Sequence, residues 1–337
     1  MGKIKKNKHF QNYWTRQFIN SLKFYSMKKV LITGGAGFIG ASLANALSEK
    51  FPNWFIVCVD NLLFGNLKRL KKAENIKFVN CDVNDFNSIS SIFYTYSFDY
   101  VFHFAAVVGV KQTLENPMLV FKDIEGIKNI VHLSYYTNVK RLFFSSSSEV
   151  YGEPFKIPQD EESTPLNSKL PYAVVKVFGE TYIRHFSRQH NLSWTIFRLF
   201  NIYGELQRPD FVISKFIKQA FKNEPITIYG DGKQTRTFLY INDLIDIIIF
   251  TIENDVFINE IINIGSDMEI TILELANIIK NLSNSKSEIV FLPPLKEGDM
   301  RRRCPDISKL RLFYKKDFIS IKDGIKRILD NPEFILK

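Results

Sequence analysis

The 337-residue sequence contains only three cysteines, Cys58, Cys81 and Cys304, which lie far apart along the chain. No two of them have the short spacing of a zinc site or a redox-active dithiol, so we expect no metal site. Long apolar runs are also missing, and nothing approaches the roughly 20 apolar residues that a membrane-spanning helix needs. Isolated cysteines of this kind are typical of reduced packing residues, so we expect a cytoplasmic protein without a membrane span.

Acidic residues are absent from residues 1–26, which carry six basic side chains and therefore supply +6 of the formal net charge of +10. The remaining excess of +4 fits an enzyme for phosphorylated substrates and requires no nucleic-acid partner. The segment could be an appended arm, an interfacial membrane helix, or an upstream addition to a body that begins at Met27. Because it has neither a clean apolar stripe nor a signal-peptide cleavage site, we expect a dispensable basic arm.

Glycine is not abundant, but three glycines in one stretch are spaced three residues apart, namely Gly34, Gly37 and Gly40. The apolar run 29–33 before them predicts a buried strand, and the periodic run 41–50 after them predicts a helix. Such a turn lets the backbone approach a pyrophosphate at a helix N-terminus. Asp60 ends the next predicted strand, where a carboxylate can bind ribose hydroxyls and repel a 2′-phosphate, so NAD is favoured over NADP. A turn without a ligand is the alternative, which this context disfavours.

Apolar runs continue at regular intervals and predict five further strands over residues 54–59, 76–79, 100–104, 141–144 and 194–200. Helical stretches lie between them, for instance over 117–136. This alternation is typical of right-handed βαβ units, so the predicted fold class is α/β, a Rossmann-type doubly wound parallel sheet. Beyond residue 200 the regular alternation of strand and helix ends, and the sequence predicts short strands and helices. We therefore expect an NAD-binding domain over 27–205 and, over 206–337, mainly a smaller C-terminal substrate-binding lobe.

A tyrosine and a lysine stand four residues apart at the start of a predicted helix, in Tyr172 and Lys176. Residues with this spacing lie on one face of a helix, and an ammonium group there favours the phenolate form of the tyrosine. The serine run 145–148 follows the end of the preceding strand. If that run points at the tyrosine, the stretch 143–176 forms a proton-transfer site.

The segment 33–40, with the sequence TGGAGFIG, and the pair Tyr172-x-x-x-Lys176 resemble the extended short-chain dehydrogenase/reductase superfamily. Within it the chain is similar to NAD-dependent nucleotide-sugar epimerases, dehydratases and decarboxylases, over about residues 27–331. The resemblance implies an NAD site in which Asp82 contacts the adenine. It assigns cofactor contacts to Gly34, Gly37, Phe38, Ile39, Gly40, Asp60, Asn61, Asp82, Val83, Phe104, Ala105, Ala106, Tyr172 and Lys176. It also implies a homodimer formed through two helices, one of which carries Tyr172.

The same resemblance assigns the chemistry. Ser147 matches the catalytic hydroxyl, Tyr172 the base, and Lys176 the residue that holds the nicotinamide ribose. A nucleotide-diphosphate sugar would be bound by Ser147, Asn201, Tyr229, Arg236 and Arg303. Guanidinium groups suit phosphate and carboxylate oxygens, which agrees with the arginines in this set. Asp123 and Lys296 depart from the asparagine and arginine of many relatives and leave details of substrate contact open.

The reaction that follows oxidation at sugar C4 depends on Ser148 and Glu149. Epimerases usually carry a small or neutral residue in place of Glu149, whereas dehydratases and decarboxylases resemble Thr-Asp-Glu or Thr-Ser-Glu there. Ser148 lacks the second carboxyl of such a dehydratase, and Lys169 replaces an arginine of the decarboxylases. Glu149 could also cap a turn or pair with a lysine. We favour a UDP-sugar 4-epimerase, with a UDP-glucuronate decarboxylase and a 4,6-dehydratase that use Glu149 as alternatives.

Hypotheses from other functional classes fit the sequence less well. A non-enzymatic NAD-binding protein would be expected to lose Tyr172 or Lys176, and the chain keeps both. An RNA-binding role would rest on residues 1–26 alone.

Overall fold

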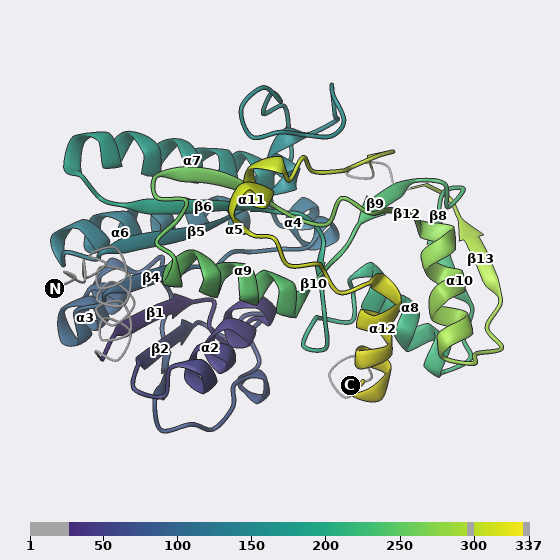
Figure 1. The fold of residues 1–337 in the computed structure, drawn as a ribbon, viewed down its shortest axis with the longest axis horizontal. Helices are drawn as coiled ribbons and strands as arrows, with labels where there is room; N and C mark the ends of the chain where they lie inside the picture. Colours follow the sequence, from purple (N-terminus) through teal and green to yellow (C-terminus); the bar gives the residue numbers. More distant parts are fainter. Residues whose placement is uncertain (1–26, 295–299, 333–337) are drawn as a thin grey trace, which may run out of the picture.

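The computed structural model describes residues 27–294 and 300–332, which form a large α/β body and a smaller lobe (Figure 1). The basic arm predicted over residues 1–26 and the departure at Lys296 lie outside the described residues. None of the helices in the described ranges is long and apolar enough to cross a membrane.

A seven-stranded sheet forms the body, in the order β11-β6-β5-β4-β1-β2-β3, and every neighbouring pair in it is parallel. Its strands are β1 (Lys29–Thr33), β2 (Phe55–Asp60), β3 (Ile76–Asn80), β4 (Tyr100–His103), β5 (Arg141–Ser147), β6 (Trp194–Leu199) and β11 (Glu260–Ile264). The strand order reverses between β1 and β4, where an open α/β sheet leaves a crevice at its carboxyl edge. The predicted fold class is confirmed.

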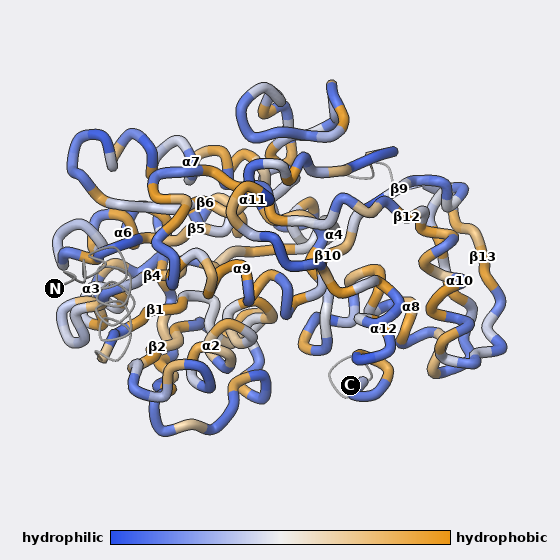
Figure 2. The backbone as a smooth tube through the Cα atoms, viewed as in Figure 1, coloured by the Kyte–Doolittle hydropathy of each residue, from blue (hydrophilic) through white to orange (hydrophobic). Residues whose placement is uncertain are grey.

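Helices cover both faces of this sheet (Figure 1). On one face lie α2 (Phe38–Lys50) and α9 (Ile241–Glu253), which share a core with residues of β1 and β2. The second core lies among α3 (Phe86–Tyr96), α6 (Asp123–Tyr136), α7 (Pro171–His190) and the opposite face of the sheet. Figure 2 shows hydrophobic residues gathered along the central strands and α9, with hydrophilic loops around them. Because helices bury both faces of the sheet, its strands are continuous apolar runs rather than alternations of apolar and polar residues.

Two details of the body differ from the sequence-based expectation. The helix predicted over 117–136 is interrupted at Lys122, between α5 (Pro117–Phe121) and α6, and α4 (Val110–Glu115) precedes it. A seventh strand, β11, pairs with β6 although it lies beyond residue 206. Since α9 also packs on the sheet, part of the C-terminal half belongs to the body.

The smaller lobe consists of short elements. They are β7 (Ile202–Tyr203), α8 (Val212–Phe221), β8 (Ile226–Tyr229), β9 (Thr235–Thr237), β10 (Leu239–Tyr240), β12 (Glu269–Thr271), α10 (Ile272–Leu282), β13 (Ile289–Leu292) and α12 (Ile321–Asp330). Helix α11 (Ser308–Phe313) packs on the body instead, where the Lys309 ammonium donates to the Ile261 carbonyl oxygen of β11 (Figure 1). Helix α10 begins with a capping box, because the Thr271 hydroxyl accepts from the Glu274 backbone N–H while the Glu274 carboxylate accepts from the Thr271 N–H. Two-stranded sheets join β8 to β13, β9 to β12 and β7 to β10.

Candidate active site

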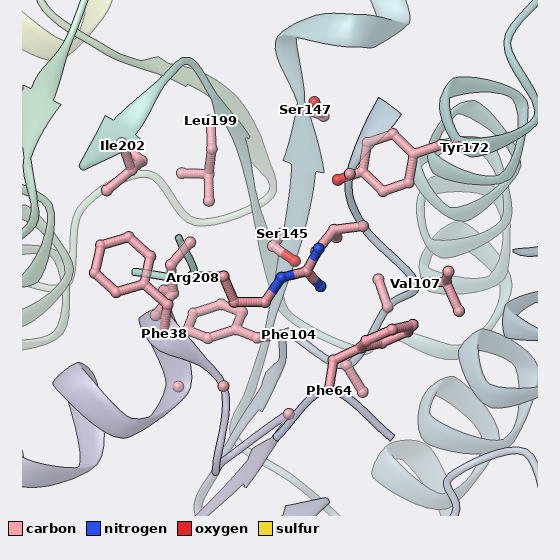
Figure 3. Close-up of a pocket in the computed structure, with 18 of the residues that line it drawn as sticks. Phe38, Phe64, Phe104, Val107, Ser145, Ser147, Tyr172, Leu199, Ile202 and Arg208 are labelled. Carbon is pink, nitrogen blue, oxygen red and sulfur yellow. The ribbon is translucent and has the colours of Figure 1, made fainter. Parts of the chain in front are cut away.

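A cavity of about 440 Å³ lies at the carboxyl edge of the sheet and is lined by residues that follow β1, β2, β4, β5 and β6 (Figure 3). All fourteen residues expected to contact the cofactor line it, from Gly34 to Lys176. Ser147, Ser148, Glu149, Asn201 and Arg303 line it as well. The body and the C-terminal segment thus contribute to one cavity, at the place where open α/β folds bind ligands.

The glycine-rich turn between β1 and α2 leaves no room for side chains. Gly34 has a φ of +67°, and a Cβ there would lie 2.8 Å from the Ala105 backbone nitrogen. A Cβ on Gly40 would lie 2.2 Å from the Gly34 carbonyl oxygen. Helix α2 starts after Gly37, and no side chain caps it. Its first backbone N–H groups can therefore donate to an anion, and the close-packed cradle fits the diphosphate of a dinucleotide.

The carboxylate of Asp60 lies at the end of β2 beside this turn. Its oxygens accept backbone hydrogen bonds from Ala36 at 3.1 Å and Leu62 at 2.8 Å. Burial raises the pKa of Asp60 above its ordinary value. An ionised carboxylate has about four acceptor positions, so two remain for ribose hydroxyls. Asp82 accepts from the backbone N–H of Asn84 at 2.9 Å and also lines the cavity. The residues present therefore fit NAD.

Ser147, Tyr172 and Lys176 are brought together as predicted. Ser147 ends β5, and its hydroxyl accepts the Glu149 backbone N–H at 3.2 Å. Tyr172 stands in the first turn of α7, and its hydroxyl points into the cavity on the side of Ser147 (Figure 3). The Lys176 Nζ lies 5.6 Å from the centroid of the Tyr172 ring. The helical spacing thus places both side chains at the cavity wall.

The pKa of Tyr172 departs from the expectation. Burial raises it above its ordinary value, and the charges of Glu149 and Asp123 add to that effect, while a hydrogen bond with Ser147 lowers it. Burial also lowers the pKa of Lys176 to about 8, against the opposing charges of Asp123 and Glu180. In the chain alone the pKa of Tyr172 is therefore raised by burial, which disfavours the phenolate, whereas the sequence led us to expect a pKa lowered by Lys176.

Glu149 pairs with an arginine, rather than with the lysine considered above. The 3₁₀ turn Ser148–Tyr151 places it against Arg303, whose Nη1 lies 2.8 Å from Glu149 Oε1 and 3.4 Å from the Ser148 hydroxyl. Within the described residues, Glu149 Oε2 and Arg303 Nε are buried without a hydrogen-bond partner. A buried pair with an open donor and an open acceptor can bind polar groups of a substrate.

Two predicted substrate residues do not line the cavity. Tyr229 ends β8 with 39% of its surface exposed, and the Lys215 ammonium lies over its ring. Arg236 is buried on β9, where its Nη1 donates to the Thr235 carbonyl oxygen at 2.7 Å. Asn201 does reach the cavity and donates to the Thr237 carbonyl oxygen at 2.9 Å. The β9 strand is thus tied to the cavity wall, with Arg236 next to that contact.

Two arginines that no sequence motif singled out also line the cavity, Arg69 and Arg208. Arg69 donates to the Ala36 carbonyl oxygen of the glycine-rich turn at 3.2 Å and to the Leu206 carbonyl oxygen at 2.9 Å. Arg69 ends a three-residue 3₁₀ turn, Leu67–Arg69, and Arg208 lies in an irregular segment, so neither has a helical or strand period long enough to indicate the direction of its side chain.

Comparison with known proteins shows the family to which the chain belongs. A family model described as "NAD dependent epimerase/dehydratase family" matches residues 30–265. A putative UDP-glucose 4-epimerase from Methanocaldococcus jannaschii is 36% identical over 89% of this chain and 97% of its own. A UDP-N-acetyl-alpha-D-glucosaminuronate decarboxylase from Bacillus cytotoxicus is 36% identical over 84% of this chain and 91% of its own.

Solved structures show the same likeness. The UDP-glucose 4-epimerase of Thermotoga maritima, determined with UDP-glucose, superposes with a TM-score of 0.86 at 29% identity, over 92% of this chain and all of that one. The family model spans more than half of the chain, and the relatives match it over most of its length. The chain therefore belongs to the NAD dependent epimerase/dehydratase family and is an enzyme that uses NAD.

Proposed function

We propose that this enzyme is a UDP-sugar 4-epimerase. The observation that carries the proposal is the cluster of Ser147, Tyr172 and Lys176 at one wall of a cavity whose opposite wall is the glycine-rich turn. The similarity to the Thermotoga maritima epimerase, which was solved with UDP-glucose, supports the same substrate class.

The side chains have separate tasks in such a reaction. Tyr172 takes the proton of the sugar 4-hydroxyl, and Ser147 hydrogen-bonds the same oxygen. Bound NAD supplies a hydride acceptor for C4, and its cationic ring favours the tyrosine phenolate. Lys176, cationic below pH about 8, adds positive charge on the same side. When the ketone presents its other face, Tyr172 would return the proton to the oxygen while the hydride taken up by the cofactor went back to C4, so that the 4-hydroxyl reforms with the opposite configuration.

A substrate panel tests this proposal. The purified protein is incubated separately with UDP-glucose, UDP-N-acetylglucosamine, UDP-glucuronate, dTDP-glucose and GDP-mannose, and the products are weighed and resolved by chromatography. We expect at least one UDP-sugar to give a new isomer of unchanged mass, because epimerisation adds and removes nothing. Loss of water from a substrate would identify a dehydratase instead, and absence of turnover with every compound would contradict the assignment.

A second candidate is a UDP-glucuronate decarboxylase, which the buried Glu149–Arg303 pair favours. In that reaction the C4 ketone serves as electron sink while the C6 carboxylate leaves as carbon dioxide. The Arg303 guanidinium could hold such a carboxylate, although Glu149 already occupies one of its nitrogens. The similarity to the decarboxylase from Bacillus cytotoxicus supports this hypothesis. Loss of the mass of carbon dioxide from UDP-glucuronate in the same panel would establish it.

We also propose that two chains pair through α6 and α7. Four aromatic residues follow one stripe of α7 at intervals of four, Phe178, Tyr182, Phe186 and His190, with centroid separations of 5.4, 6.1 and 4.3 Å. All four are only half-buried in one chain, and a second copy would cover them. Light scattering should give twice the mass of one chain, and Phe186→Glu should shift the protein to monomer. A monomeric unaltered protein would contradict the pairing.

A cytoplasmic location is part of this proposal. The cysteines in the described part of the chain, Cys58, Cys81 and Cys304, are free and buried. Burial raises the pKa of each thiol, to about 12 for Cys58 and about 11 for the other two, so the reactive thiolate is scarce. Unbridged, unreactive cysteines support a reducing compartment.

A further inference from the structure

Arg208 comes from the segment between β7 and α8, and its side chain extends across the cavity (Figure 3). Its guanidinium carbon lies 5.0 Å from the centroid of Phe64, in the loop that follows Asp60, and 5.6 Å from that of Phe211. The side chain therefore links the segment before α8 to the loop after β2.

The glycine-rich turn lies beside this link. Arg69 ties the same three segments together, since it donates to the carbonyl oxygens of Ala36, Phe64 and Leu206. Arg208 is thus on the cofactor side of the cavity, beside the segments that contact the turn between β1 and α2.

The hydrogen bonds of Arg208 are incomplete. Its Nε and Nη2 lie 3.0 and 2.5 Å from the two carboxylate oxygens of Asp210, which is exposed. Its Nη1 is buried and has no hydrogen-bond partner among residues 27–294 and 300–332. A buried guanidinium nitrogen without an acceptor is unfavourable, so its position indicates a partner that the chain itself does not provide.

The charges nearby favour an anionic partner. Burial and the charge of Arg208 both lower the pKa of Arg69, so the two guanidinium groups repel each other across the cavity wall. Asp60 faces Arg69 but already accepts two backbone hydrogen bonds, and Asp210, which pairs with Arg208, is about half exposed. An anion placed between the arginines and the start of α2 would offset both positive charges.

We propose that Arg208 binds the diphosphate of NAD from the side opposite the glycine-rich turn and so retains the cofactor in its cleft. The backbone N–H groups at the start of α2 bind one side of the diphosphate, and Arg208 Nη1 donates to an oxygen on the other. Phe64 and Phe211 hold the stem of the arginine in place, and Asp210 orients its plane.

Arg208→Met tests the proposal, because methionine keeps an apolar stem between the two rings and removes the charge. Titration calorimetry on cofactor-stripped protein should show NAD and ADP-ribose binding about 10- to 100-fold more weakly, as expected for one charge-assisted hydrogen bond. The rate at which bound NAD leaves, followed after mixing with an NAD-consuming enzyme, should rise by a similar factor. UDP, which brings a diphosphate to the substrate side, should bind as before.

Two matched variants complete the experiment. Arg184→Met removes an exposed arginine of α7 outside the cavity and should leave the affinity for NAD unchanged. Asp210→Asn keeps Arg208 in place and should retain most of the affinity. An unchanged affinity for NAD in Arg208→Met, or a loss confined to UDP, would overturn the proposal. An equal loss of NAD affinity in Asp210→Asn would also overturn the proposal. The conformation of the segment, rather than the Arg208 guanidinium, would then determine the affinity for NAD.

Discussion

Replacing Tyr172 by phenylalanine should lower turnover by about 10²- to 10⁴-fold, the usual contribution of a general base, while NAD remains bound. In the proposed reaction the Tyr172 hydroxyl group, as phenolate, takes the proton of the sugar hydroxyl, and its hydrogen bond with Ser147 places it at that position. The phenyl ring fills the same space, so the wall formed by α7 keeps its shape. The loss should therefore appear in kcat rather than in cofactor affinity.

The measurement compares turnover of the best substrate in the panel with NAD content after gel filtration. Tyr94→Phe is the matched control, because it removes an exposed tyrosine hydroxyl of α3 outside the cavity and should leave turnover unchanged. If Tyr172→Phe kept near-normal turnover with NAD bound, Tyr172 would not be the base. If NAD were lost as well, the variant would report on cofactor binding and the assigned role would be contradicted.

The parts of the site that could be predicted from the sequence depend on local patterns. A glycine turn between a strand and a helix has a fixed geometry, and a four-residue spacing on a helix fixes a common face. For this reason Gly34, Asp60, Tyr172 and Lys176 all line one cavity, as expected. Six strands of the sheet could also be predicted from the sequence, because strands that are buried on both sides are continuous apolar runs.

Contacts between distant segments could not be predicted in this way. Glu149 and Arg303 are 154 residues apart, and nothing near either residue indicates the other. Strand β11 was missed because its residues, Glu260–Ile264, follow a helix and a run of turns in the region expected to be the lobe. The direction of the Tyr172 pKa shift depends on burial, which spacing does not report. Arg208 lies in an irregular segment without a period.

The largest effect on stability is expected from a buried ion pair beneath the serine run. Arg198 on β6 donates through Nε and Nη2 to the two oxygens of Glu180 on α7, at 2.9 and 2.7 Å, and through Nη1 to the Tyr151 hydroxyl at 2.9 Å. Both charged side chains are about 2% exposed, and the Ser146 hydroxyl also donates to Glu180. The pair joins β5, β6 and α7 directly behind the catalytic residues.

Arg198→Leu should lower the free energy of unfolding by about 3–5 kcal/mol, because it leaves the Glu180 carboxylate buried without its counter-charge. Urea unfolding followed by tryptophan fluorescence measures this change. The double variant Arg198→Leu/Glu180→Leu should regain most of the loss, since apolar groups of similar volume can replace a buried pair. Lys128→Leu breaks an exposed pair with Glu125 on α6 and should cost no more than about 1 kcal/mol. A similarly small loss for Arg198→Leu would mean that water reaches Glu180, and the pair would then not hold α7 against the sheet.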